Sequence, residues 1–546
     1  MGKFIYYQMK YSFLSKVLLF FYCLVGLLST SVAQKTSSQN GKDIQQLEQQ
    51  ANNYYSLEKY YLAEPLFYKL DSIKPNTPTY AYKLGVCYIF TNKEEKALPI
   101  FEAALKKPTL YPKALLYFSA RAYHLNHRFD DAIKYYERYK AFVSKEGDKY
   151  KTTILANLKR QIEMCKNGKE LIKDPLPLEI YNLGPEINSP YPDYGPVVTA
   201  DEEQIIFTSN RPNTTGGQKT EEGVYYEDIY ISKKTPEGWT PAVQLPELNT
   251  SGHDASKAIS PNGEKMILYR FGKDKLLSSA SGDLYMSENK NGQWHKPERL
   301  GDKINSPGWE PSASLPEDDR IIYFVSNRPG GFGGTDIYSI KKLPNGEWAE
   351  PWNLGPVINT PYDEDSPFIS PDGKTLYFSS TGHKSMGGYD IFISRYDETK
   401  KQWSAPENVG YPISTAQDDL YFSWSSDGTR IYFSSVRPGG YGDKDIYYAS
   451  IRKNNTTLVL KGKIQEAGSM QPLEATIKIS DMESNEAVTS VTTNSTTGKF
   501  IAVLNTGKKY RITYESSNYQ VSSEIIDLTG SDNATELEKN VILEKY

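Results

Sequence analysis

A short motif that recurs five times at nearly constant spacing constrains the fold more than any other feature of this sequence. It is Asp-Ile-Tyr or a close variant, in steps of 55, 53, 54 and 55 residues, and begins at Asp228, Asp283, Asp336, Asp390 and Asp445. Most copies follow a turn and an apolar strand, as in Ser260-Pro261-Asn262-Gly263 before Met266–Tyr269. A tryptophan follows each of the first four copies: Trp239, Trp294, Trp348 and Trp403. Clusters of strands at a fixed period predict the blades of a β-propeller.

The segment around residues 178–184 predicts how the ring of blades closes. The fifth copy lacks the tryptophan strand, and Leu178–Gly184 resembles the stretch that ends in Trp352-Asn353-Leu354-Gly355. We therefore predict an all-β, five-bladed propeller over residues 175–452, closed by its own N-terminal strand. The aspartate of each motif is suited to accept hydrogen bonds from the amides of a neighbouring turn.

Residues 43–172 follow a different period, with apolar residues at three- and four-residue steps that indicate helices. A tyrosine, an alanine and a second aromatic residue recur at offsets of 34 and then 35 residues: Tyr54, Ala63, Phe67; Tyr88, Ala97, Phe101; Tyr123, Ala132, Tyr136. Small residues let paired helices approach, and aromatic residues fill the space between them. We predict an all-α solenoid of helix pairs, capped by a last helix over about 151–166.

Residues 456–546 are again β-rich but lack the motif. Alternating strands are expected around turns rich in Thr, Ser, Asn and Gly, at 458–464, 475–480, 490–493, 500–504, 510–514 and 541–543. About 90 residues of short strands indicate a small all-β sandwich.

The N-terminus has the pattern of an export signal. Lys3, Lys10 and Lys16 precede the apolar run Val17–Leu28, and small residues lead to Ala33. This predicts a signal peptide over residues 1–33 and an exported chain with no further run long enough to span a membrane.

Charge is distributed unevenly along the chain. The net charge is −4, but residues 34–173 carry +9 and residues 174–546 carry −16. A chain with this overall balance gives no indication of nucleic-acid binding. The basic helical part is interpreted as an ordinary solvated face, with a surface for an acidic partner or for the protein's own acidic half as the alternatives. Three cysteines exclude a disulfide framework and a four-cysteine zinc site. Cys87 and Cys165 are expected either as separate buried thiols or as one disulfide.

No catalytic constellation is present in the sequence. Gly-x-Ser-x-Gly does not occur, and 90 β-rich residues are too few for the α/β domain of a hydrolase. His295 and Glu298 have His-x-x-Glu spacing but fall at a variable outer-strand position, so zinc is not expected there. The acidic stretches 363–365 and 418–419 are interpreted as structural turns, with calcium binding as the alternative. We predict no enzyme activity, no catalytic residue, no cofactor and no metal site.

These patterns resemble known families. The helical repeats, with Leu84-Gly85 and Ala104, resemble tetratricopeptide (TPR) repeats, and the five-copy segment resembles WD40-like, TolB-type propellers. Three short runs in the last segment resemble carboxypeptidase-regulatory-like, transthyretin-type modules: Gly462-Lys463-Ile464, Pro472-Leu473 and Gly498-Lys499-Phe500. The order of the segments resembles Bacteroidota periplasmic OmpA-family proteins, which include a component of type IX secretion. Those relatives carry a C-terminal OmpA-like domain, which is not found here, so direct peptidoglycan anchoring is not expected.

The resemblance implies a periplasmic scaffold, peripheral to the outer membrane, that binds cell-envelope proteins through the TPR groove and the propeller faces and acts in type IX secretion or envelope assembly. Candidate partner-binding residues by motif phase are Tyr82, Tyr117, Arg121 and His124. The alternative is a module that binds glycans or peptidoglycan fragments on the propeller face.

Overall fold

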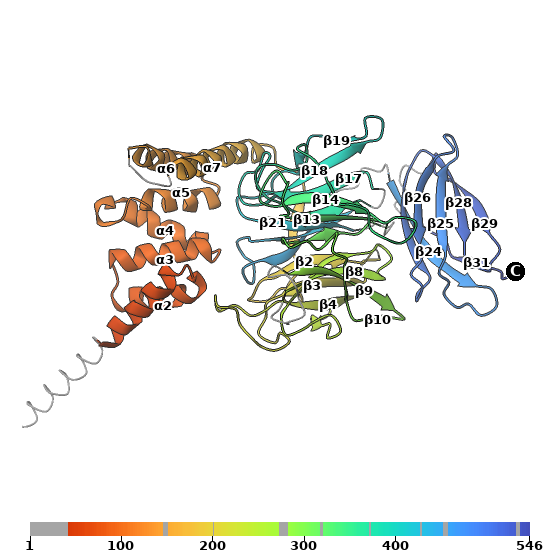
Figure 1. Cartoon of the computed structure of the whole chain (residues 1–546), viewed down its shortest axis with the longest axis horizontal. Coiled ribbons are helices and arrows are strands. Elements are labelled where there is room, and N and C mark those ends of the chain that lie inside the picture. Colours follow the sequence, from red (N-terminus) through yellow and green to blue (C-terminus); the bar gives the residue numbers. More distant parts are fainter. Residues whose placement is uncertain are drawn as a thin grey trace, which may run out of the picture. The chain divides into compact units, whose positions relative to one another are not determined.

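The computed structural model describes residues 42–145, 151–199, 201–271, 282–316, 320–370, 373–425, 429–450, 457–530 and 536–546. The predicted signal peptide, residues 1–33, lies outside these ranges. The chain divides into two compact units, one up to Pro112 and one from Lys113 onward. Figure 1 labels most of the helices and strands described below. This division falls inside the segment 43–172, so the later predicted helices belong to the same unit as the β region.

The first unit consists of paired helices. A helix over residues 42–56 is followed by α2 (Tyr60–Ile73), α3 (Pro78–Phe90), α4 (Glu94–Leu105) and the 3-10 turn η1 (Pro108–Leu110). Ala63, Phe67, Ala97 and Phe101 are buried, in agreement with their repeated spacing. A Cβ on Gly85 would lie 3.0 Å from the Phe101 ring, so the glycine is what lets α3 and α4 approach.

Three further helices open the second unit. They are α5 (Leu115–Leu125), α6 (Phe129–Val143) and α7 (Lys151–Leu171), and α6 packs against both others. The last helix continues beyond the predicted end near residue 166. Its last turn is anchored by Gly168, where a Cβ would lie 2.5 Å from the Phe129 ring. The glycine therefore serves helix packing here and does not end the helix.

Five antiparallel sheets follow. The first contains β2 (Asp193–Val198), β3 (Gln204–Ser209), β4 (Asp228–Thr235), β5 (Gly238–Trp239) and β6 (Val243–Gln244); the second contains β7 (His253–Ile259), β8 (Lys265–Phe271), β9 (Asp283–Lys290), β10 (Gln293–Trp294) and β11 (Glu298–Arg299). The third contains β12 (Ala313–Ser314), β13 (Ile321–Ser326), β14 (Asp336–Lys341) and β15 (Trp352–Asn353). The fourth contains β16 (Glu364–Ile369), β17 (Thr375–Ser380), β18 (Asp390–Asp397), β19 (Gln402–Trp403) and β20 (Glu407–Asn408). The fifth contains β21 (Asp419–Trp424), β22 (Arg430–Ser435), β23 (Asp445–Ser450) and β1 (Glu179–Asn182).

The repeated aspartate begins one strand in every sheet: β4, β9, β14, β18 and β23. Its carboxylate accepts a hydrogen bond from a loop amide in four of them, from Thr215 to Asp228 (2.6 Å), Phe332 to Asp336 (2.7 Å), Met386 to Asp390 (2.5 Å) and Tyr441 to Asp445 (2.7 Å). This confirms the role predicted for the motif. In the second sheet the preceding loop is outside the described residues, and Asp283 pairs with Arg299 at 2.9 Å.

The first strands of the five sheets contact one another in succession. β2 contacts β7, β7 contacts β12, β12 contacts β16, β16 contacts β21, and β21 contacts β2. β1 pairs with β23, with Glu179 opposite Ser450, as the sequence predicted for this segment. Asn188 Oδ1 also accepts the Ile446 amide at 2.8 Å, the same contact that Asn305 makes with Leu284 inside the second sheet.

Two further sheets form the C-terminal part, around a buried cluster that includes Leu460, Ile477, Phe500 and Tyr514. One contains β24 (Thr457–Glu466), β27 (Lys499–Asn505), β30 (Glu536–Glu538) and β31 (Val541–Leu543); the other contains β25 (Thr476–Asp481), β26 (Ala487–Thr492), β28 (Lys509–Glu515) and β29 (Ser522–Asp527). Strands β29 and β30 were not predicted. β29 is an edge strand that buries only Ile526 fully, so its apolar alternation is weak.

Within the described ranges, no helix is long and apolar enough to cross a membrane. Cys87 and Cys165 are buried, unpaired thiols, and burial raises the pKa of each to about 12. The sequence left open whether these two cysteines are separate thiols or form one disulfide, and in the structure they are separate thiols.

Candidate functional site

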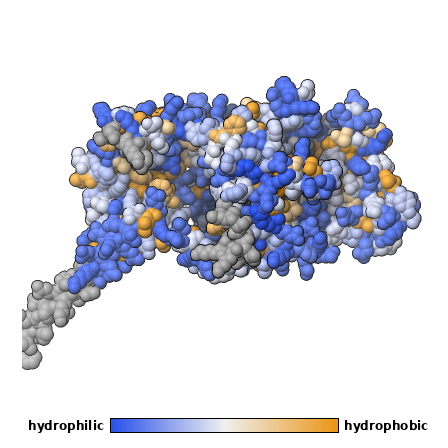
Figure 2. Space-filling model, viewed as in Figure 1, coloured by the Kyte–Doolittle hydropathy of each residue, from blue (hydrophilic) through white to orange (hydrophobic). Residues whose placement is uncertain are grey.

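The first unit carries an open groove of about 900 Å³ lined mainly by amide side chains. The lining residues are Gln46, Gln49, Gln50, Asn52, Asn53, Tyr55, Ser56 and Lys83. All but Lys83 come from the helix over residues 42–56, and Lys83 comes from α3. Figure 2 shows these first helices as largely hydrophilic on the face in view. Amide side chains donate and accept hydrogen bonds at once, which suits them to the backbone of another chain.

Lys83 is the charged group of this groove. Its Nζ donates to Asn52 Oδ1 at 2.5 Å and lies 5.1 Å from the centre of the Tyr55 ring. Burial lowers the pKa of Lys83, while Glu48 acts in the opposite direction. A half-buried ammonium held by an amide and an aromatic ring is placed to meet an acceptor on a bound chain.

The four residues predicted from motif phase lie in different surroundings. Tyr82 is in the first unit, buried beside Phe101 and Tyr111. The other three are on α5. The rings of Tyr117 and His124 both pack against Tyr136, and Arg121 donates to Gln161 at 3.2 Å. The structure thus brings Tyr117, Arg121 and His124 together but places Tyr82 in the other unit.

His124 belongs to an internal contact between the helices and the fourth sheet. It is fully buried, and its Nε2 lies 2.8 Å from the Met386 carbonyl oxygen. Burial, together with the charge of Arg121, lowers the pKa of His124 to about 3, so the ring is neutral. Asn167 on α7 donates to the Ser385 carbonyl at 2.8 Å, in the same loop.

Arg160 on α7 is the centre of this contact. Its Nη2 donates to the carbonyl oxygens of Thr381 (2.6 Å) and Gly382 (2.7 Å), and its guanidinium lies 4.7 Å from the Tyr362 ring centre. Arg160 was not predicted as a functional residue from the sequence. The available signal was in the fourth repeat, where Gly382-His383 stands in place of the Arg-Pro found at Arg328-Pro329 and Arg437-Pro438.

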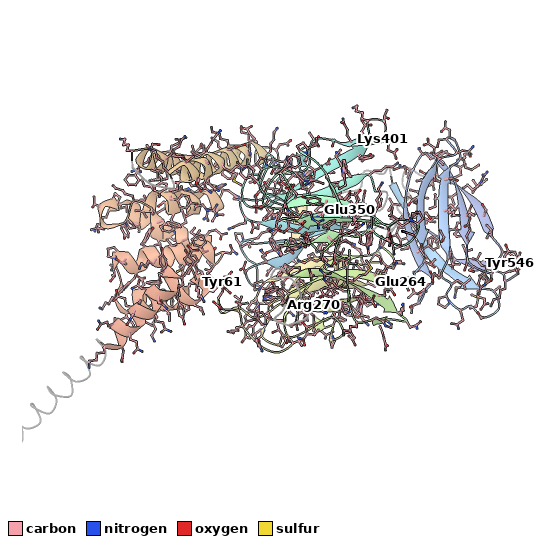
Figure 3. All side chains as sticks on the ribbon, in the orientation of Figure 1. Tyr61, Glu264, Arg270, Glu350, Lys401 and Tyr546 are labelled. Carbon is pink, nitrogen blue, oxygen red and sulfur yellow. The ribbon has the colours of Figure 1, made fainter. Side chains whose placement is uncertain are left out.

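That replacement changes the chemistry of a recurring buried acid. In four sheets an arginine pairs with the acid near the start of the first strand: Arg211 with Asp193, Arg270 with Asp254, Arg328 with Glu310 and Arg437 with Asp419 (Arg270 is labelled in Figure 3). In the fourth sheet the equivalent Glu364 accepts hydrogen bonds from the Thr360 amide and from the Thr360 and Ser380 hydroxyls. No Arg or Lys of the described residues pairs with it. Burial raises the pKa of Glu364 to about 7.

Replacing Glu364 with glutamine is therefore expected to alter how stability depends on pH. The folded-state pKa lies above the ordinary value of 4.5, so the stabilising proton is fully bound below pH 4.5 and is lost as pH rises through 7. Wild type therefore loses stability as the carboxyl ionises, and Glu364→Gln does not. The free energy of unfolding of Glu364→Gln, measured relative to wild type, should rise by about 2–3 kcal/mol from pH 4 to pH 8. Urea unfolding at several pH values measures this. Exposed Glu350→Gln is the control, and parallel pH profiles for wild type and Glu364→Gln would contradict the prediction.

Among the described residues no group of three or more His, Cys, Asp or Glu side chains is arranged to hold a metal ion. His253 Nδ1 instead contacts the Glu227 carboxylate. Glu364 and Asp419 begin β16 and β21 and do not lie in turns, and their carboxylates are engaged by hydroxyl, amide and arginine donors.

Comparison with known proteins identifies no family. No protein-family model and no curated protein matches this chain. Among solved structures, a complex of BT0996 with RGII matches with a TM-score of 0.38 and 10% identity over 53% of this chain and 96% of that one. An alpha-L-arabinofuranosidase from Lactobacillus brevis matches with a TM-score of 0.33 and 12% identity over 50% and 92%. The Sgt2 TPR domain from Aspergillus fumigatus matches with a TM-score of 0.20 and 22% identity over 24% and 88%. Likenesses at these TM-scores do not indicate an activity for this chain.

Proposed function

We propose that this chain is a non-enzymatic, periplasmic scaffold, peripheral to the outer membrane, that binds other proteins of the bacterial cell envelope and acts in type IX secretion or envelope assembly. The amide-lined groove of the first unit is the observation that carries this proposal. Its donors and acceptors suit an extended segment of a partner, and Lys83 supplies one positive charge for an acidic group on it. The sequence resemblance to periplasmic OmpA-family proteins of Bacteroidota supports the same assignment.

The proposal includes the finer architecture. The helix pairs are TPR-like repeats, the five sheets form one closed five-bladed propeller, and the last two sheets are a regulatory-like sandwich. Closure is supported by the contact of β21 with β2, by the pairing of β1 with β23, and by Asn188 bonding to Ile446.

Crosslinking in intact cells, followed by purification and mass spectrometry, tests the scaffold function. The amount of envelope partner that co-purifies with full-length Lys83→Met should be about one tenth of that with wild type, because the variant loses a charge-assisted hydrogen bond to the partner. The exposed Lys69→Met should recover them at the wild-type level. Equal recovery by both variants, or the absence of any envelope partner from wild type, would refute the proposal.

A second candidate function, glycan or peptidoglycan-fragment binding, is favoured by exposed aromatic residues on the β part. Trp352 is 72% exposed and Trp309 is 40% exposed, and flat rings of this kind stack on sugar faces. Binding of soluble peptidoglycan fragments by the wild-type chain, weakened in Trp352→Ala and Trp309→Ala, would support it. No binding at millimolar fragment would remove it.

A further inference from the structure

A cavity of about 100 Å³ lies among the first strands of the five sheets that begin with β2, β7, β12, β16 and β21. It is called here the five-strand cavity, and its wall includes Val197, Lys257, Leu315, Phe368 and Trp424 from β2, β7, the end of β12, β16 and β21. An apolar cavity of ~150 Å³ is large enough for benzene. The five-strand cavity therefore accommodates one small aliphatic group, and a sugar ring with its hydroxyls does not fit.

Irregular backbone aims side chains into this cavity. The ladder between β7 and β8 shifts register between Ser256 and Ala258, and Lys257 is the extra residue of that bulge. In the fifth sheet the shift lies between Leu420 and Ser423, and Tyr421 there has a φ of 59°. Positive φ recurs at the equivalent bulges, at Gly195 (64°) and Ser366 (50°), so this conformation belongs to the repeat; at a tyrosine it costs roughly 1–3 kcal/mol. Bulges of this kind redirect side chains, here onto the wall of the cavity.

Lys257 lacks the partner that a recessed ammonium requires. Within the described ranges no hydrogen bond or ion pair reaches its Nζ, which lies 5.0 Å from the Tyr421 ring centre and 5.7 Å from that of Tyr269. The nearby carboxylates are held by other donors. Glu227 is bonded by Tyr194 and His253, and Asp365 by Ser312. Burial lowers the pKa of Lys257, which Asp365 and Glu227 oppose.

A second donor in the same wall is also unsatisfied. The indole N–H of Trp424 is buried and has no hydrogen-bond partner among the described residues. A buried donor without an acceptor costs about 1–3 kcal/mol, and the Trp424 indole N–H is such a donor in the wall of a cavity that is otherwise largely apolar. A ligand with an anionic acceptor would pair with the Lys257 ammonium, and a small aliphatic group on the same ligand would fill the apolar part of the cavity.

We propose that the five-strand cavity binds the C-terminal residue of a partner polypeptide, with its free carboxylate on Lys257 and a Val- or Leu-sized side chain against Val197, Leu315 and Phe368. Charge complementarity identifies the carboxylate, and the volume limits the side chain. This inference rests on the proposed scaffold function and gives the scaffold a second partner-binding site. Because the cavity and the Lys83 groove lie in different units, the two sites can be tested independently.

Fluorescence anisotropy with the full-length chain tests this inference. The probes are two labelled hexapeptide libraries with random sequence before a fixed C-terminal leucine, one with a free carboxylate and one with a carboxamide. Wild type should bind the acid library at least about tenfold more tightly than the amide library, and Lys257→Met should lose that preference. The exposed Lys233→Met should keep it.

A readout of folding separates binding from structure. Because Lys257→Met removes a recessed charge, its melting temperature should equal or exceed that of wild type. Loss of the acid preference with a lowered melting temperature would mean that Lys257 is structural and would overturn the inference. So would equal affinity for the two libraries, or no binding of either at millimolar peptide. Loss of acid-library binding in Lys257→Met but not in Lys83→Met would support this cavity whatever the outcome for the groove.

Discussion

Replacing Arg160 with alanine is expected to lower the free energy of unfolding of the second unit by about 3–4 kcal/mol. The Arg160 side chain is 7% exposed, and its guanidinium donates to the carbonyl oxygens of Thr381 and Gly382. Alanine would remove the Arg160 donor from the Thr381 carbonyl, would leave the Gly382 carbonyl with the Ser385 amide as its donor, and would remove the stacking on Tyr362. All seven tryptophans lie between residues 239 and 424, so their fluorescence during urea unfolding reports on this unit alone.

Two comparison variants make the Arg160 result specific. The neighbouring Lys159 is exposed, so Lys159→Ala should stay within about 0.5 kcal/mol of wild type. Arg160→Lys should fall between wild type and Arg160→Ala, because an ammonium cannot reproduce the planar set of donors. If Arg160→Ala unfolds at the same urea concentration as Lys159→Ala, the contact of α7 with the fourth sheet does not stabilise the protein.

Replacing Gly333 with alanine is expected to lower the free energy of unfolding by about 3 kcal/mol, because the added methyl group would clash with backbone atoms. A Cβ at this position would lie 1.8 Å from the Tyr362 carbonyl oxygen and 2.5 Å from that of Thr360. Both acceptors belong to rigid backbone at the start of the fourth sheet, so neither can move aside as a flexible side chain would. Gly442 makes the matching approach from the fifth sheet to Tyr191 and Ser189.

The control for Gly333 is another glycine with open surroundings. A Cβ on Gly301 would have no atom within 4 Å, and its φ lies outside the left-handed region, so Gly301→Ala should be neutral or slightly stabilising. Thermal unfolding followed by tryptophan fluorescence compares the two. Similar melting temperatures for Gly333→Ala and Gly301→Ala would mean that adjacent sheets do not depend on this close approach.

The repeating part of the fold could be predicted because each repeat carries its own local signal. Aspartate before an apolar strand, and turns before the next strand, are short-range patterns, so β4, β9, β14, β18 and β23 begin at the predicted residues. The pairing of β1 could be predicted because residues 178–184 resemble a strand found elsewhere in the same chain.

The contacts that do not repeat could not be predicted in the same way. Arg160 reaches a loop more than 220 residues away, and nothing near Arg160 in the sequence encodes that distance. His124 was selected for its place in a helical repeat, yet its partner, the Met386 carbonyl, is a backbone atom that any residue would supply. Lys257 is an ordinary strand residue by pattern, and only the bulge in β7 directs it to the cavity.

The pairing of β1 with β23 also bears on how the protein acquires its structure during synthesis. The paired residues Glu179 and Ser450 are separated by about 270 positions. A ribosome adding 5–20 residues per second needs on the order of 15–50 seconds to make that stretch, and β1 has no partner until then. The other four sheets are built from neighbouring segments and can form as they emerge. A chain of this design therefore presents a lone strand late in its synthesis, which is the interval in which a holding chaperone would have most to protect.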